Sequence, residues 1–235
     1  MLTYHKIGPR PAGARLKGLY LSQKLFAEQL AELKSAGWKS MTLDDALANG
    51  SVATIPEHVA ITFDDGFENT LDHALEPLRQ NQFRAIQFIV AARMGQHNIW
   101  DLPDGEVAAP LMDAAQLRDW LAAGHQIGSH SLTHPRLTQL SLDAAREEIH
   151  ASKKLLEDTF GVPVGHFCYP NGDWNPAIRD LVAEAGYVTA CTTEFGVNKP
   201  EDSPLSLKRI TARYPSRNWK NFKQWLGRKL AISGS

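Results

Sequence analysis

The chain has 235 residues, of which 43% are hydrophobic and 22% are charged. These are ordinary values for a globular protein, and they exclude a disordered, collagen-like or coiled-coil chain. A net charge of −1 gives no overall field that would favour a nucleic acid, so none is expected as a partner.

The first residues contain neither a basic segment nor an apolar run, and they therefore do not resemble a signal peptide. No apolar run approaches the roughly 18 residues that a membrane-spanning helix needs. The sequence as written predicts a cytoplasmic protein, or an extracytoplasmic one if it belongs to a longer chain with a leader. The two cysteines, Cys168 and Cys191, are too few for a disulfide framework.

Short apolar runs alternate with amphipathic segments, and no linker divides them, which indicates a single α/β domain. The predicted elements in chain order are a helix at 22–36, strands at 59–63 and 85–90, a helix at 113–123, a strand at 126–129, a helix at 141–160, a strand at 166–169, a helix at 175–186, and strands at 187–191 and 209–211. Six or seven such units favour a barrel, although the pattern also fits an open sheet. In both folds functional groups gather at the carboxyl ends of the strands.

Two adjacent acids, Asp64 and Asp65, follow the first of these strands within the run Thr-Phe-Asp-Asp-Gly at 62–66. Carboxylates leaving a buried strand are costly to desolvate unless a cation meets them. Because neighbouring strand residues point to opposite faces, we expect different roles, one at a metal and one as a base or orienting group. Taken alone, the run is also explained by an ordinary turn.

Two histidines four residues apart, His130 and His134, follow the strand at 126–129. The zincin protease pattern requires a glutamate directly after the first histidine, and Ser131 stands there instead. Joined to a strand-end acid, the pair forms a two-histidine, one-carboxylate set, which is typical of hydrolytic zinc and of non-haem iron. An iron oxygenase would not need a second acid beside the first.

A turn and an early histidine complete the candidates. Pro170 and Gly172 predict a tight turn in the run Cys-Tyr-Pro-Asn-Gly-Asp-Trp at 168–174, where a backbone N–H can face a developing oxyanion. His5 lies in an apolar setting, which on its own indicates a partly buried, hydrogen-bonded side chain.

Together, the blocks at 62–66 and 130–134 resemble the signature motifs of the polysaccharide deacetylases of carbohydrate esterase family four, the NodB homology domain. The resemblance spans residues 1–215. It implies a distorted (β/α)7 barrel forming one domain over 1–235, with 216–235 as a basic helical extension. It also implies a metal-dependent hydrolase that removes N-acetyl groups from GlcNAc-type residues of a poly- or oligosaccharide and releases acetate.

The resemblance also implies roles for individual residues. Asp65, His130 and His134 would hold one divalent metal, with zinc expected first and cobalt, nickel and iron as alternatives. Asp64 would be the general base, and the backbone N–H of Asn171 would be the oxyanion donor.

The chain departs from the family pattern at two places. Cys168 stands where the family has an arginine partner for the base, and no histidine follows His166, so the late Leu-x-x-His block is missing. The opening Tyr4-His5 resembles that of the biofilm poly-N-acetylglucosamine deacetylases, in which an N-terminal histidine is the general acid. On this ground we assign His5 as the acid.

Other interpretations stay open at this point. The substrate is alternatively a lipid-linked or small intracellular N-acyl sugar or amide, and the missing arginine and late histidine also fit a catalytically impaired carbohydrate-binding homologue. Trp100, Tyr169 and Trp174 are candidates for stacking on sugar rings or for packing. The segment 217–229 interleaves aromatic and basic residues, which fits weak contact with a membrane surface but more often indicates packing on the barrel. The sequence does not indicate an oligomeric state.

Overall fold

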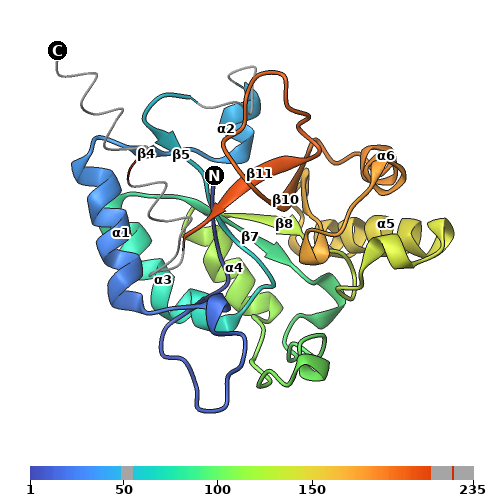
Figure 1. Ribbon diagram of the computed structural model, residues 1–235, viewed down its shortest axis with the longest axis horizontal. Coiled ribbons are helices and arrows are strands. Elements are labelled where there is room, and N and C mark those ends of the chain that lie inside the picture. The colour runs from blue at the N-terminus through green and yellow to red at the C-terminus, as the bar shows by residue number, and fades with distance from the viewer. Residues whose placement is uncertain (49–54, 213–223, 225–235) are drawn as a thin grey trace.

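The computed structural model describes residues 1–48, 55–212 and 224, and its centre is a closed barrel of seven parallel strands (Figure 1). Around the barrel the order is β1-β11-β10-β9-β8-β7-β6, and β6 pairs again with β1. The strands are β1 (Leu2–Tyr4), β6 (Ile61–Phe63), β7 (Ala85–Ile89), β8 (Gln126–Ser129), β9 (His166–Cys168), β10 (Thr189–Phe195) and β11 (Leu207–Thr211). The predicted (β/α)7 barrel is confirmed, and the open-sheet alternative is excluded.

The N-terminal strand β1 closes the barrel. Leu2 is in register with Ile61 of β6 on one side and with Ile210 of β11 on the other. Our sequence analysis did not predict β1, because three residues are too few to show a strand period. Its position brings the start of the chain to the middle of the molecule (Figure 1).

Helices surround the barrel, and their ends follow local capping chemistry. They are α1 (Gln23–Ser35), α2 (Leu43–Ala48), α3 (Glu68–Asn81), α4 (Ala114–Ala122), α5 (Leu142–Phe160) and α6 (Pro176–Glu184). The side chain of Asp113 accepts from the N–H of Gln116, whose side chain reciprocates, so the predicted capping box is confirmed. Helix α3 was not predicted, since it begins without a side-chain cap and contains Pro77.

Minor elements complete the described chain. Two short parallel pairs join β2 (Lys6–Ile7) to β3 (Tyr20–Leu21) and β4 (Lys39–Ser40) to β5 (His58–Val59). Short 3-10 turns are η1 (Lys17–Leu19), η2 (Ala91–Arg93), η3 (Leu102–Asp104), η4 (Leu137–Gln139) and η5 (Pro170–Gly172). None of the helices in the described ranges is long and apolar enough to cross a bilayer. The predicted extension at 216–235 and the segment 217–229 lie almost wholly outside the described residues.

The strands predicted at 59–63 and 187–191 have clearly different limits in the structure, and the one predicted at 209–211 begins earlier, at Leu207. The run at 59–63 is divided between β5 and β6, because Ala60 lies between them and its carbonyl accepts from the N–H of Leu2. The strand predicted at 187–191 begins at Thr189 and continues to Phe195. Its last residues are exposed, so they lack the buried apolar pattern by which the strand was recognised.

The inside of the barrel is narrow and apolar below the site. Phe88, Cys168, Cys191 and Leu207 are buried in one interior cluster. A Cβ at Gly128 would lie 2.6 Å from the ring of Phe88, so only glycine fits where that ring fills the barrel. Side chains therefore fill this part of the barrel interior.

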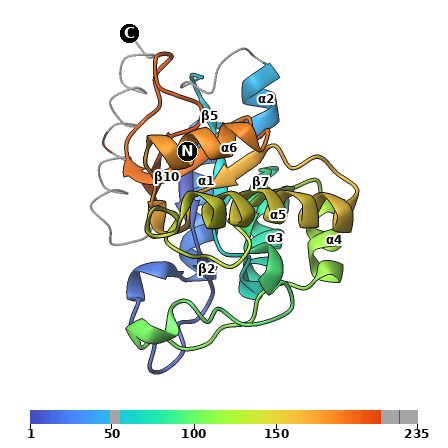
Figure 2. The same ribbon diagram turned by 90° about the vertical axis from the view of Figure 1, so that its right-hand side faces the viewer.

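Two loops at the carboxyl ends of the strands are joined to each other (Figure 2). The buried carboxylate of Glu106, in the loop 95–112, accepts from the backbone N–H groups of Arg15 and Leu16 and from the hydroxyl of Tyr20. The loop 8–19 is thereby held against the loop that carries Trp100. Both loops stand beside the strand ends at which the two predicted acids lie.

Candidate active site

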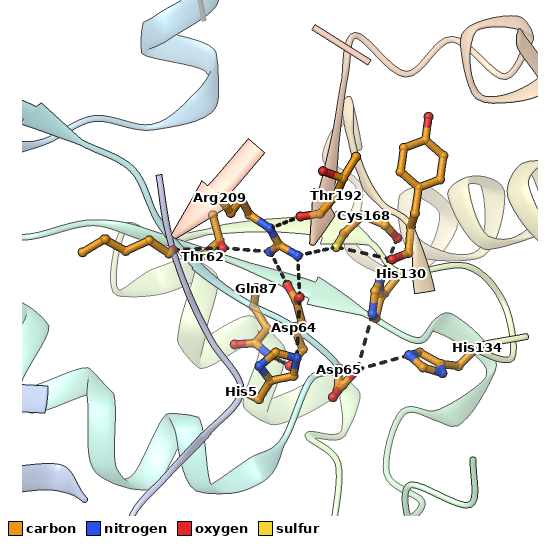
Figure 3. Close-up of polar contacts among 12 residues, drawn as sticks. His5, Thr62, Asp64, Asp65, Gln87, His130, His134, Cys168, Thr192 and Arg209 are labelled. Atoms are coloured by element: carbon orange, nitrogen blue, oxygen red, sulfur yellow. Dashed lines mark hydrogen bonds and ion pairs between the residues drawn. The ribbon is translucent and has the colours of Figure 1, made fainter. Parts of the chain in front are cut away.

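Asp64 and Asp65 leave the end of β6 in different directions (Figure 3). Asp64 faces Arg209 of β11, whereas Asp65 faces His130 and His134. Asp65 has a φ of 76°, and this left-handed conformation turns the chain between the two side chains. The two acids therefore lie in different environments, as the sequence predicts.

Asp65, His130 and His134 form a compact set of metal-ligating groups. One carboxylate oxygen, Oδ1 of Asp65, lies 3.4 Å from the Nε2 atom of each histidine. The three ligand atoms lie within 4.8 Å of one another, and all three residues are buried. These distances exceed a good hydrogen bond, so the groups surround a common point.

The tautomer of His130 suits a metal ligand. Its Nδ1 lies 2.7 Å from the carbonyl oxygen of Cys168 and donates to it, because a carbonyl only accepts, so the neutral ring has its lone pair on Nε2, the nitrogen that faces Asp65. A backbone carbonyl on the far nitrogen is the usual second contact of a ligating histidine. The three residues therefore fit a divalent cation. Nitrogen and carboxylate ligands suit zinc, cobalt, nickel and iron alike.

Burial and the neighbouring charges both shift the pKa values of the three residues in this set. Burial opposes the ionised form of Asp65, but the adjoining histidines hold its pKa well below the usual range. Burial also opposes the charged form of His130, yet the carboxylate of Asp65 raises its pKa, while burial lowers the pKa of His134. The cluster thus keeps an anionic carboxylate in a buried place, which requires a cationic partner.

The second histidine is oriented differently from the first. The ring of Trp100 stacks on His134 with centroids 4.5 Å apart. Nδ1 of His134 is buried and has no hydrogen-bond partner among the described residues. His134 is therefore placed by ring packing and by its own backbone.

Asp64 forms a two-pronged ion pair with Arg209. Nη1 and Nη2 of the guanidinium each lie 2.7 Å from one carboxylate oxygen. The remaining donors of Arg209 reach the Thr192 carbonyl at 2.9 Å, the Thr62 hydroxyl at 3.0 Å and the Cys168 sulfur at 3.2 Å. Arg209 is 1% exposed and is fully engaged.

This pair changes our interpretation of Cys168. The sequence predicts that Asp64 has no arginine partner, but β11, which β1 alone separates from β6, supplies Arg209. Burial would raise the pKa of Asp64, and the charge of Arg209 lowers it below the usual value. An arginine in a barrel strand beside apolar residues such as Ile210 indicates an acidic partner if its side chain is buried, and Arg209 is the signal in the sequence that could have pointed to this pair.

His5 lies beside the same carboxylate. Its Nε2 is 3.8 Å from Oδ2 of Asp64, and its side chain is 22% exposed, so solvent or a ligand can reach it. The Thr70 hydroxyl donates to the backbone carbonyl of His5 and fixes the chain just after β1. The structure thus brings His5 to the site, although it is far from the other residues in sequence.

The turn with Asn171 directly follows β9. Asn171 and Gly172 both have positive φ, 58° and 68°, and the N–H of Gly172 donates to the Tyr169 carbonyl. A Cβ at Gly172 would approach the side chain of Thr193 to 2.0 Å, so glycine is required here. Because Cys168 contacts His130, this turn begins next to the metal-ligand set.

The three aromatic candidates have different environments. Tyr169 is buried and its hydroxyl donates to the Leu205 carbonyl, so stacking on a sugar is wrong for this residue. Trp174 is half-buried, stacks on Tyr169 and donates through Nε1 to Glu194 at 3.2 Å. Trp100 is half-buried and packs on His134.

Comparisons with known proteins show the family and the fold of this chain. Residues 51–190 match the family described as Polysaccharide deacetylase. The Bacillus subtilis protein YxkH is 24% identical over 89% of this chain and 70% of its own length, and a Bacillus cereus peptidoglycan-N-acetylglucosamine deacetylase is 31% identical over 56% of this chain and 54% of its own. Two further curated relatives are matched over 27% and 25% of their length. The structure of IcaB from Ammonifex degensii has a TM-score of 0.81 at 22% identity, covering 96% of this chain and 95% of that one, which shows the same fold.

Proposed function

Because this chain belongs to the polysaccharide deacetylase family, we propose that it hydrolyses the N-acetyl groups of GlcNAc-type residues in a poly- or oligosaccharide and releases acetate. The observation that carries the proposal is the pair of acids at the end of β6. One is held by two histidines that suit a metal, and the other is kept ionised by Arg209. A protein that only binds sugars would need neither an acid placed to hold a metal nor a second acid kept ionised beside it.

Asp65, His130 and His134 would hold the divalent cation, with zinc as the first choice. Such a cation supplies Lewis acidity, which lowers the pKa of a water molecule and polarises an acyl oxygen. The fit of the site rests on the tautomer of His130 and on the shared oxygen of Asp65.

The remaining residues account for the proton transfers. Asp64, ionised beside Arg209, accepts the proton of the attacking water. The backbone N–H of Asn171 donates to the tetrahedral oxyanion, a contact typically worth about 3 kcal/mol. His5 donates a proton to the departing sugar nitrogen, because an amine is a poor leaving group unless it is protonated.

The proposal is tested by acetate release from the metal-loaded protein on a substrate panel. The panel contains β-1,4- and β-1,6-linked N-acetylglucosamine oligomers, acetylated xylan and lipid-linked N-acetyl sugars, with Asp64→Asn as the blank. Release from an amino-sugar substrate, lost with chelator and restored by zinc or cobalt, supports the proposal. Metal binding without release from any substrate would contradict it.

We further propose the β-1,6-linked polymer as substrate, since His5 beside Asp64 matches the opening of the poly-N-acetylglucosamine deacetylases. The peptidoglycan-N-acetylglucosamine deacetylase relative makes the β-1,4 oligomers the proper comparison. Faster release from β-1,4 than from β-1,6 oligomers would reject the finer proposal and leave the deacetylase activity intact.

The role of His5 gives a separate prediction. His5→Gln is expected to lower kcat on the N-acetyl substrate by about 100-fold or more, because the amine then leaves without its proton. Hydrolysis of an activated aryl acetate, whose leaving group needs no proton, is expected to change little.

Both rates are measured across pH, with the exposed His97→Gln as the matched control. Loss of amide and aryl ester hydrolysis to the same extent would show that His5 does not act as the acid.

A further inference from the structure

The loop that carries both histidines is held from two sides. On one side, the N–H groups of Ala91 and Ala92 donate to the carbonyls of Ser131 and Leu132, at 3.0 and 2.9 Å. These bonds attach the loop to η2, at the end of β7. They use the carbonyl groups of the loop and leave its N–H groups for another partner.

On the other side, Glu148 of α5 accepts three hydrogen bonds from the same loop. Its Oε2 accepts from the N–H groups of Leu132 and Thr133, at 3.0 and 2.9 Å, and its Oε1 accepts from the hydroxyl of Thr133. Bonds to a carboxylate are stronger than those between neutral groups. One side chain thus holds two of the three residues between His130 and His134, which are Leu132 and Thr133.

The same face of α5 also contacts β8, the strand that precedes the loop. Ser152, one helical turn after Glu148, lies with its hydroxyl 2.8 Å from that of Ser129 at the end of β8. Glu148 and Ser152 therefore fix the loop relative to the strand from one rigid helix.

The backbone of this loop has a conformation that needs such support. Ser131 and His134 have φ values of 63° and 71°, in the left-handed region that residues other than glycine seldom adopt. The Ser131 hydroxyl accepts from the N–H of His134 and stabilises the turn locally. Among the described residues, Nδ1 of His134 has no hydrogen-bond partner of the kind that usually orients a ligating histidine, so its backbone and the stacking of Trp100 decide where Nε2 points.

We infer that Glu148 is a positioning residue for the metal site, acting through the backbone of the loop 131–134. This inference rests on the proposed metal site of Asp65, His130 and His134. Residues that orient metal ligands typically change metal affinity by about 10- to 100-fold when they are replaced. The effect is expected to follow the reach of the side chain rather than its charge.

Two conservative variants separate reach from charge. Glu148→Asp keeps the charge but is one methylene too short for the loop, and it is expected to weaken Co²⁺ binding by about 10- to 100-fold. Glu148→Gln has an amide oxygen that can accept both N–H groups, and it is expected to keep most of the affinity. Glu147→Asp, at the exposed neighbour on α5, controls for the helix propensity of aspartate.

Affinity is measured on the folded apoprotein by chelator competition with Co²⁺, and the visible absorption of the bound Co²⁺ reports its coordination geometry. Wild-type affinity in Glu148→Asp would overturn the inference, as would equal losses in Glu148→Asp and Glu148→Gln. If the wild-type protein itself does not bind Co²⁺, the proposed metal site fails, which is a different result from failure of Glu148. Melting temperatures of the apoproteins show whether a variant has lost its fold.

Discussion

Replacing Asp64 by asparagine is expected to lower acetate release by about 100- to 10,000-fold while Co²⁺ or Zn²⁺ still binds. An amide cannot accept the proton of the attacking water, and Asp64 is not one of the three proposed metal ligands, Asp65, His130 and His134. The measurement is kcat/KM for acetate release, together with the metal content of the purified variant.

The control must account for the buried ion pair. Asp64→Asn leaves the Arg209 guanidinium without its counter-charge, so some loss of stability is expected along with the loss of activity. The melting temperature of the metal-loaded variant therefore has to lie above the assay temperature. Asp119→Asn, an exposed acid on α4, serves as the comparison for acid-to-amide replacement. A folded, metal-loaded Asp64→Asn protein with more than a tenth of wild-type activity would contradict the role of base.

Replacing Arg209 by methionine is expected to affect both stability and pH dependence. Removal of one partner of a buried pair typically costs about 3–5 kcal/mol, and a chain of this size loses about 2–4 °C in Tm per kcal/mol. Without the guanidinium, burial of Asp64 is opposed only by the smaller effects of His5 and His130, so its pKa is expected to rise. The acidic limb of kcat/KM, which requires ionised Asp64, is then expected to move to higher pH. Metal binding is followed over the same pH range to separate protonation of the base from protonation of the ligands.

The sign of the stability effect follows from the same pKa. In the wild-type protein the pKa of Asp64 is lowered on folding, so the pair stabilises the fold above the unfolded value of 3.8. That contribution is lost as the pH falls through the folded value. Between pH 7 and pH 4 this contribution is therefore almost constant in the wild type. In Arg209→Met the folded pKa of Asp64 is expected to lie above 3.8 instead, so relative to the wild type the difference between melts at pH 7 and pH 4 is expected to shift toward greater stability at pH 4. An unchanged difference would show that the pair does not control the ionisation of Asp64.

A second replacement tests from which strand the positive charge beside Asp64 has to come. Cys168 lies 3.2 Å from Nη2 of Arg209, so its side chain borders the same space from β9. The double variant Arg209→Met with Cys168→Arg is expected to recover part of the lost stability and to return the acidic limb toward its wild-type position. If Cys168→Arg gives no recovery, the position of the cation on β11 matters beyond its charge.

The sequence was informative where the chemistry is local. Adjacent acids after a buried strand, two histidines four apart and a Pro-Asn-Gly turn predicted the strand ends at which Asp65, His130 and Asn171 lie. Capping residues such as Asp113 placed the helix ends closely. These features depend on bonds and steric limits within a few residues, so they are visible without the fold.

Other features required the tertiary structure. Only barrel closure brings Arg209 to Asp64 across 145 positions of the chain, and only the pairing of β1 with β6 brings His5 beside the same carboxylate. The contact of Glu148 with the loop 131–134 is equally non-local. The packing of distant strands and helices around one core brings these partners together. No periodicity or spacing in the sequence shows that they are close in space. The sequence alone therefore determined the family motifs and the candidate metal ligands, whereas the cationic partner of Asp64 and the support of the loop 131–134 were decided by the closed barrel.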